Sequence, residues 1–140
     1  MTADATVDAL VQLSFLVQRV LAAAGGEHDL SIVQMRMLGI LRDRQPGMLA
    51  LGAHLDLDKS STTGLVTRAE RRGLVRRSPS PHDGRAVLVD LTPLGRELTE
   101  RCTAEVGRRL AVLTAGLGAD GREQLTRLAE AILASAAPSR

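Results

Sequence analysis

Apolar positions recur every three or four residues over long stretches of the chain, and this spacing predicts helices. The longest such stripe runs through residues 94–117, and Thr92 followed by Pro93 is typical of a helix start. Residues 6–26 show the same spacing on more than one face, so we expect this helix to be covered on several sides, by its own chain or by a second copy. A final helix is expected with Asp120 as its cap.

Shorter helices are predicted between the first and the longest one. Ser31 and Gln34 have the spacing of a capping box at the start of a helix within residues 30–44. Residues 49–55 form a short apolar helix, and the next helix is expected to begin after Asp58 and to end at Gly73. The pattern therefore predicts a helix-turn-helix with a very short connection.

A change of period follows Gly73. In residues 85–91 the positions of Val87, Val89 and Leu91 alternate with those of Ala86, Leu88 and Asp90, which predicts a strand, and residues 74–78 are strand-like. The segment between them is rich in Pro, Asp and Gly and predicts the turn of a hairpin. A hairpin directly after a helix-turn-helix makes a winged helix, so the expected fold is mainly α with a small β-hairpin wing.

Charge and composition narrow the function. Residues 58–85 hold seven Lys or Arg and three acids, a net charge of +4, although the whole chain carries only +2. Concentrated positive charge indicates an anionic partner, with nucleic acid the first candidate and a solvated face the alternative. With one Phe and no Trp or Tyr, a binder that stacks single-stranded bases is not expected.

The same composition bears on location and chemistry. We expect no membrane-spanning stretch and no signal peptide, hence a cytoplasmic protein. Cys102 is the only cysteine and lies on an apolar stripe, so it is interpreted as buried and inert. His28, His54 and His82 lie in different elements without paired spacing, and no cofactor or metal site is predicted. The sequence has no catalytic fingerprint, so an enzyme is not expected.

Three segments together resemble one known family. They read "LSIVQMRML", "LALGAHLDLDKSSTTGLVTRAERRGLVRR" and "HDGRAVLVDLTPLGREL", and they are similar to the MarR-type transcriptional regulators. The resemblance implies a sequence-specific repressor of double-stranded DNA that acts as a homodimer on a near-palindromic operator. It also implies a winged helix-turn-helix over residues 30–92 and dimerisation helices over residues 5–25 and 93–137, intertwined into a single domain.

The expected DNA-binding residues lie on the second helix of the helix-turn-helix and on the wing. Thr62, Leu65, Val66 and Ala69 should face inward, leaving the polar side chains of that helix near the major groove. The expected set is Lys59, Ser60, Ser61, Thr63, Thr67, Arg68, Arg77, His82, Asp83 and Arg85. In the resembling family the position of Arg85 enters the minor groove, and the acid that matches Asp83 helps to hold that arginine. The alternatives are a solvated surface helix and an ordinary turn.

Regulation is predicted only in outline. Members of the family are often released by a small, frequently phenolic, anion, and such a ligand is expected near Phe15, Arg19, Met35 and Leu38. Ordinary core packing of Phe15, Met35 and Leu38 is the alternative. Ser14 stands where the peroxide-sensing branch carries its reactive cysteine, which argues against peroxide sensing. A non-specific architectural DNA-binding protein and a winged helix used for protein contacts are the competing functions.

Overall fold

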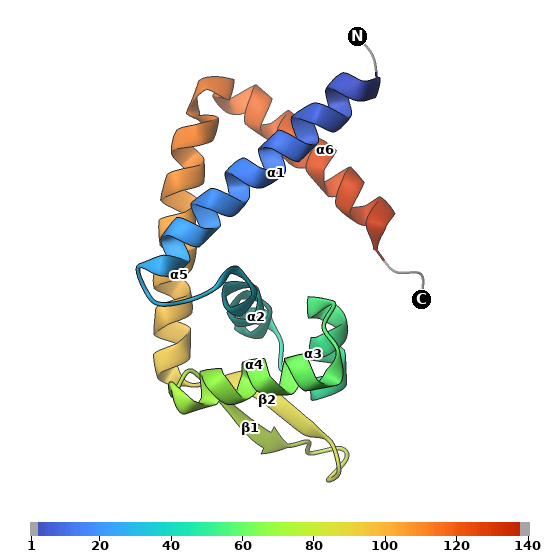
Figure 1. Ribbon diagram of the computed structural model, residues 1–140, viewed down its shortest axis with the longest axis vertical. Coiled ribbons are helices and arrows are strands. Elements are labelled where there is room, and N and C mark those ends of the chain that lie inside the picture. Colours follow the sequence, from blue (N-terminus) through green and yellow to red (C-terminus); the bar gives the residue numbers. More distant parts are fainter. Residues whose placement is uncertain (1–2, 138–140) are drawn as a thin grey trace. The chain divides into compact units, whose positions relative to one another are not determined.

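The computed structural model describes residues 3–137 (Figure 1). In chain order the elements are α1 (Ala3–Gly26), α2 (Ile32–Asp43), α3 (Met48–Leu55), α4 (Lys59–Arg71), β1 (Val75–Pro79), β2 (Val87–Leu91), α5 (Pro93–Thr114), the 3-10 turn η1 (Ala115–Leu117) and α6 (Gly118–Ala136). The mainly helical fold with one two-stranded hairpin is confirmed. Residues 3–106 and residues 107–137 form two compact units, and α5 runs from the first into the second.

Local capping explains where α2 and α4 begin. The Ser31 hydroxyl accepts a hydrogen bond from the Gln34 amide and the Gln34 side chain accepts one from the Ser31 amide, so the predicted capping box is present. Asp58 caps α4, as expected. The prediction that Asp120 caps α6 is wrong: the helix begins at Gly118, whose φ is +70°, and Asp120 lies in the first turn.

The helix-turn-helix is held together by close contact between α3 and α4. Leu51 and Leu55 of α3 are buried, together with the α4 residues that were predicted to face inward: Thr62, Leu65, Val66 and Ala69. A Cβ on Gly52 would lie 2.8 Å from the Thr62 hydroxyl, so a glycine here permits this approach. The chain turns at Asp56, whose φ of 55° is left-handed.

The hairpin that follows α4 is the predicted wing. Its antiparallel register pairs Val75 with Leu91 and Pro79 with Val87. The strands differ from the expected bounds, since β1 extends to Pro79 and β2 begins only at Val87. Val89 and Leu91 are buried, which seats one face of the wing on the core.

The sequence did not reveal a further pairing of β2. Gly47 forms an isolated antiparallel bridge with Leu88, and the Val89 amide donates to the Pro46 carbonyl at 3.0 Å. The segment before α3 therefore also anchors the wing. This contact ties β2 to the segment that leads into α3.

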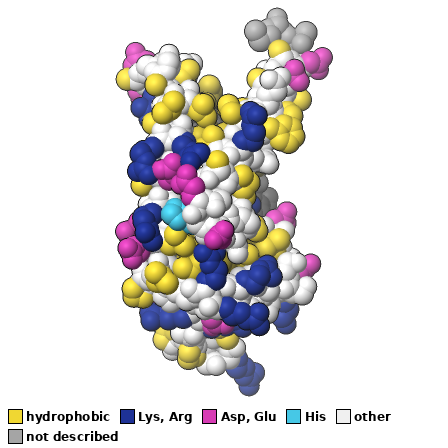
Figure 2. All heavy atoms as spheres, turned by 60° about the vertical axis from the view of Figure 1, so that its left-hand side comes forward, with side chains coloured by type: hydrophobic (Ala, Val, Ile, Leu, Met, Phe, Trp, Pro, Cys, Tyr) yellow, Lys and Arg dark blue, Asp and Glu magenta, His cyan; other side chains and the backbone are white. Residues whose placement is uncertain are grey.

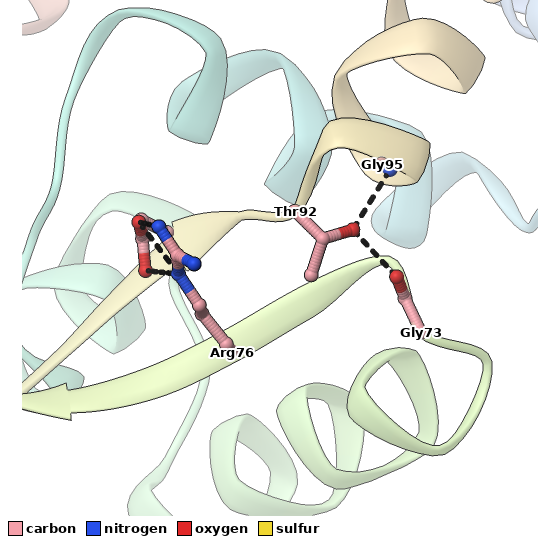
Figure 3. A network of polar contacts seen from close by, with 5 residues as sticks. Gly73, Arg76, Thr92 and Gly95 are labelled. Atoms are coloured by element: carbon pink, nitrogen blue, oxygen red, sulfur yellow. Dashed lines mark hydrogen bonds and ion pairs between the residues drawn. The ribbon is translucent and has the colours of Figure 1, made fainter.

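Thr92 joins the wing to α5 (Figure 3). Its hydroxyl donates to the Gly73 carbonyl and accepts a hydrogen bond from the Gly95 amide at 3.0 Å. Its own amide donates to the Leu74 carbonyl at 3.0 Å. Gly95 packs so tightly there that a Cβ would overlap the carbonyl oxygen of Leu74. The predicted cap and the predicted first residue, Pro93, are both confirmed.

Helix α1 leaves much of its apolar surface exposed. Val7, Leu10, Val11 and Phe15 are exposed, and only the C-terminal half of the helix is partly covered. Within the span Asp4–Gly26 an 18-residue window has a mean hydropathy of 1.5, so by length and composition alone this helix could cross a membrane. The expectation that no stretch reaches that length is wrong, because Gln12, Gln18 and Arg19 are too few to lower the mean. Core helices and signal sequences pass the same test.

The second unit also exposes an apolar stripe. Leu125, Leu128, Ile132 and Leu133 of α6 are all exposed, as are Val112, Leu113 and Leu117 before it. The long stripe predicted over residues 94–117 is thus buried only in part: Leu98 and Cys102 lie in the core, whereas Leu94 does not.

Candidate nucleic-acid interface

The N-terminal turn of α4 presents a row of polar side chains. Lys59, Ser60 and Ser61 are exposed, and Thr63 is half-buried. The Asp58 carboxylate accepts hydrogen bonds from the Ser61 amide at 2.7 Å and the Ser60 hydroxyl at 3.1 Å. The Ser61 amide, followed by the hydroxyls, lowers the pKa of Asp58 below its ordinary value of 3.8. The carboxylate is therefore ionised at neutral pH, and it orders the turn that carries the predicted contact residues.

Further along α4, the predicted DNA-binding residues differ in their exposure and in whether their side chains already form hydrogen bonds within the protein. The Thr63 hydroxyl donates to the Lys59 carbonyl at 2.8 Å within the helix. Arg68 is exposed, and its guanidinium lies against Gly64, where a Cβ would be 3.2 Å from Nη1. Thr67 is half-buried, and its hydroxyl oxygen accepts a hydrogen bond from Arg77. The helix thus presents its first two turns and Arg68 to solvent.

The paired arginines of β1 contact different elements, in line with the alternation of a strand. Arg76 forms an ion pair with Asp90 directly across the hairpin at 3.2 Å (Figure 3). Arg77 turns to α4, where its Nη2 donates to the Thr67 hydroxyl at 2.7 Å and its Nε lies 3.7 Å from a Glu70 carboxylate oxygen.

The tip of the wing is organised by two short side chains. The Ser80 hydroxyl accepts hydrogen bonds from the His82 and Asp83 amides at 3.2 and 3.3 Å. The Asp83 carboxylate accepts one from the Arg85 backbone amide at 3.0 Å. The acid therefore shapes the backbone on which Arg85 stands, whereas the resemblance implied that it holds the arginine. The side chains of His82 and Arg85 are exposed.

The positive charge of residues 58–85 lies on α4 and on the hairpin that follows it. Figure 2 shows Lys and Arg side chains over the lower part of the molecule, where α4 and the hairpin lie in this view. Such a surface favours a polyanion, and its two parts, a helix and a projecting hairpin, differ in shape. A helix fits the wide groove of duplex DNA and an arginine fits the narrow one.

The four residues expected to line an effector site do not share one cavity. Phe15 and Arg19 border a broad, open hollow along α1. Met35 and Leu38 border a cavity of about 330 Å³ between α2 and α5, together with Arg36, Thr99 and Cys102. Leu38 is also fully within the core, as the alternative interpretation expected. Ile32 borders both spaces, so they are neighbours.

Sequence reasoning missed the role of Arg72, the C-terminal cap of α4. Its guanidinium donates to the carbonyls of His28 and Asp29, both at 2.9 Å, and so ties α4 to the connection between α1 and α2. It also missed a groove of about 630 Å³ bordered by α3, α4 and the wing, where Leu49 is 89% exposed. The sequence pattern does not mark this groove, because the exposure of Leu49 is decided only by the folded chain.

Other chemistry finds little support among the described residues. Cys102 is buried, and burial raises the pKa of its thiol, as expected for an inert cysteine. The Ser14 hydroxyl accepts a hydrogen bond from Gln18 at 3.3 Å. Within residues 3–137 no three His, Cys, Asp or Glu side chains gather in a way that could hold a metal ion.

Comparison with known proteins identifies relatives of this chain. The sequence model of the MarR family matches residues 28–86. The homoprotocatechuate degradative operon repressor of Escherichia coli is 32% identical over 109 residues, which are 76% of this chain and 73% of that protein.

Two solved structures resemble the chain over nearly its whole length. NadR in complex with 4-hydroxyphenylacetate has a TM-score of 0.81 at 25% identity and covers 94% of this chain and 92% of its own. A mutant MarR from E. coli in complex with operator DNA has a TM-score of 0.71 at 29% identity and covers 95% of this chain and 99% of its own. The chain therefore belongs to the MarR family of winged helix-turn-helix transcriptional regulators.

Proposed function

We propose that the protein is a sequence-specific repressor that binds double-stranded DNA as a homodimer on a near-palindromic operator. The observation that carries the proposal is the pairing of two exposed elements, the polar N-terminal half of α4 and the wing tip with Arg85. A similar relative is a repressor, and a similar structure holds operator DNA, which supports this function. Repression requires only that the bound protein blocks transcription, so no catalysis is proposed.

Helix α4 would enter the major groove with its N-terminal turns. Lys59, Ser60, Ser61 and Thr63 would meet bases or phosphates there, and the N-terminus of the helix favours a phosphate. Arg68 extends the same face. Arg85 would enter the adjacent minor groove, where the negative potential is enhanced, while His82 stays close to the backbone.

A second copy of the chain would cover the apolar surfaces of α1 and α6. Their exposed Val, Leu, Ile and Phe side chains form more apolar surface than isolated exposed residues would. A second copy is a better occupant for α1 than a lipid bilayer, because Asp8, Gln12, Gln18 and Arg19 lie along the helix. A twofold dimer would present two α4 helices to half-sites about 34 Å apart, in the cytoplasm where the DNA lies.

A small aromatic anion would control release from DNA. NadR was solved with 4-hydroxyphenylacetate, which supports this class of ligand. The cavity between α2 and α5 is mostly apolar and has Arg36 at its border, so it suits an aromatic ring with an acid group. Met35 and Leu38 would contact the ring, whereas Phe15 and Arg19 border the neighbouring hollow. A thermal-shift screen with aromatic acids tests this, because a ligand of the folded state raises the melting temperature.

Selection of bound duplexes from a random library tests the DNA function. We expect a near-palindromic site, and fluorescence anisotropy should show at least about 1000-fold tighter binding to it than to random duplex. Equal affinity for both would favour the architectural alternative. Arg85→Glu should weaken binding at least about tenfold. Arg42→Glu applies the same change of charge to an exposed arginine of α2 and should have a small effect. Unchanged binding of the Arg85 variant would contradict the role of the wing.

A further inference from the structure

We propose that Arg77 is a positioning residue that fixes the angle between the wing and α4, and that it does not bind DNA phosphate. The inference rests on the proposed DNA-binding function and deepens it, because it assigns one of the predicted contact residues a different task. The two elements it joins are those that would enter adjacent grooves. Their relative angle therefore decides whether both can enter at once.

The contact between Arg77 and α4 is short and specific. Nη2 of Arg77 donates to the Thr67 hydroxyl at 2.7 Å, the distance of a strong charge-assisted hydrogen bond. Thr67 is half-buried and its helix is firmly seated, since Val66 on one side of it is fully buried. Arg77 is exposed as a residue, but its side chain keeps only 33% of its surface exposed, because it lies along α4.

The charge of Arg77 is already matched by an acid of α4. Its Nε lies 3.7 Å from a carboxylate oxygen of Glu70. If the guanidinium moved to a phosphate, Glu70 would be left close to the polyanion without its partner, and the two negative charges would repel each other. Both contacts therefore favour Arg77 remaining on α4 when DNA binds.

The position of Arg77 along the hairpin gives it influence over the tip. It pairs with Val89 in the middle of the register, between the base at Val75 and the turn beyond Pro79. At about 3.3 Å per residue, a small rotation at the middle of the strand moves the tip by a larger distance. Arg85 stands on that tip. A loosened Arg77 would therefore misplace Arg85 without removing any DNA contact.

The neighbouring arginine supplies a matched control. Arg76 lies on the same strand and also faces an acid, but its partner Asp90 belongs to β2, so this pair stays within the hairpin. Arg76→Gln and Arg77→Gln remove the same charge one residue apart. Thr67→Val removes the hydroxyl that Arg77 holds and leaves every charge in place.

Binding to the selected duplex over a range of salt concentrations separates the two roles. We expect Arg77→Gln and Thr67→Val each to weaken binding by about three- to tenfold, and the double variant to be no weaker than Arg77→Gln alone. Arg76→Gln should have little effect. The slope of log affinity against log salt should be the same for the Arg77 and Arg76 variants. A slope reduced by about one in Arg77→Gln alone, with Thr67→Val neutral, would assign Arg77 to phosphate and overturn the proposal.

A footprint distinguishes misplacement from general loss of stability. Below the unfolding temperature, Thr67→Val should lose protection of the minor-groove positions that the wing covers and keep protection in the major groove. Uniform loss of both would count against a positioning role.

A DNA-free measurement keeps this inference separate from the proposed function. We expect a double-mutant cycle on thermal unfolding to show coupling between residues 67 and 77, and faster amide exchange in β1 of both variants. Absence of coupling would overturn the positioning role of Arg77, even if the protein binds its operator. If the wild type selects no duplex, the proposed function fails, and coupling in the free protein still decides whether Arg77 fixes the wing.

Discussion

At the scale of the residue, Asp58 connects local chemistry to the position of α4. Its carboxylate accepts hydrogen bonds from the Ser61 amide and the Ser60 hydroxyl, and its backbone carbonyl accepts one from the Thr62 hydroxyl at 2.7 Å. One residue thus caps the N-terminus of the helix and positions Ser60 and Ser61, two of the exposed polar side chains. The charge also faces the positive end of the helix dipole.

The pH dependence of this cap follows from the lowered pKa of Asp58. Because the pKa in the folded protein lies below 3.8, the cap stabilises the fold above that pH and loses its effect as the pH falls through the folded value. Asp58→Ala should lower the melting temperature by a few degrees at about pH 6 and by less at about pH 3, because that pH lies below the unfolded pKa of the carboxyl. Calorimetry at both pH values checks this. Asp120→Ala, in a first turn but not at a cap, should change less, and an equal loss at both pH values for Asp58→Ala would contradict the argument.

Residue-scale features were predictable where the interaction is local. Ser31, Asp58 and Thr92 cap groups two or three positions away, so the sequence alone contains both partners. Thr67 and Arg77 are ten residues apart, and both were predicted to face DNA because one lies on the second helix of the helix-turn-helix and the other on the wing. Their partnership depends on how β1 folds back along α4, which the local pattern does not contain.

At the scale of the element, the first turn of α5 illustrates packing that only one residue type allows. Gly95 is buried against the backbone of Leu74, while Gly107 of the same helix has open space around its Cα. The amphipathic stripe predicted the helix itself, but the same stripe could not show which turn is docked. The bridge between Gly47 and Leu88 was hidden for a similar reason, since a single pairing leaves no alternation to detect.

The two glycines of α5 should respond in opposite directions to the same substitution. Gly95→Ala forces the Leu74 carbonyl and the helix apart, and we expect a loss of about 2–4 kcal/mol in the free energy of unfolding. Gly107→Ala adds only a better helix former at an open position and should gain about 0.5–1 kcal/mol. Urea unfolding of both variants measures the difference. Equal stabilities would mean that α5 does not dock on Leu74 in solution.

At the scale of the whole molecule, the exposed apolar side chains require a partner surface. Phe15 on α1 is 62% exposed and Leu128 on α6 is 58% exposed. The sequence predicted that α1 has more apolar surface than one face can bury, because the apolar positions of residues 6–26 cover more than one face. It could not indicate which faces remain exposed once the chain has folded.

The proposed homodimer gives a direct test of that surface. Sedimentation velocity at micromolar concentration should show a dimer for the wild type, and Leu128→Glu should shift it toward the monomer because a charge cannot be buried without a partner. Leu49→Glu introduces the same change at an exposed leucine of α3 and should leave the dimer intact. A wild-type chain that sediments as a single protomer would remove the basis for two half-sites.

The bridge that Thr92 forms between Gly73 and Gly95 has a mechanical consequence. These two hydrogen bonds hold the turn after α4 directly against the first turn of α5. A tilt of one helix is therefore expected to tilt the other. A movement of α5 would therefore reach α4, the helix proposed to meet DNA, without a relay of side chains. The Thr92 hydroxyl alone would couple the two helices.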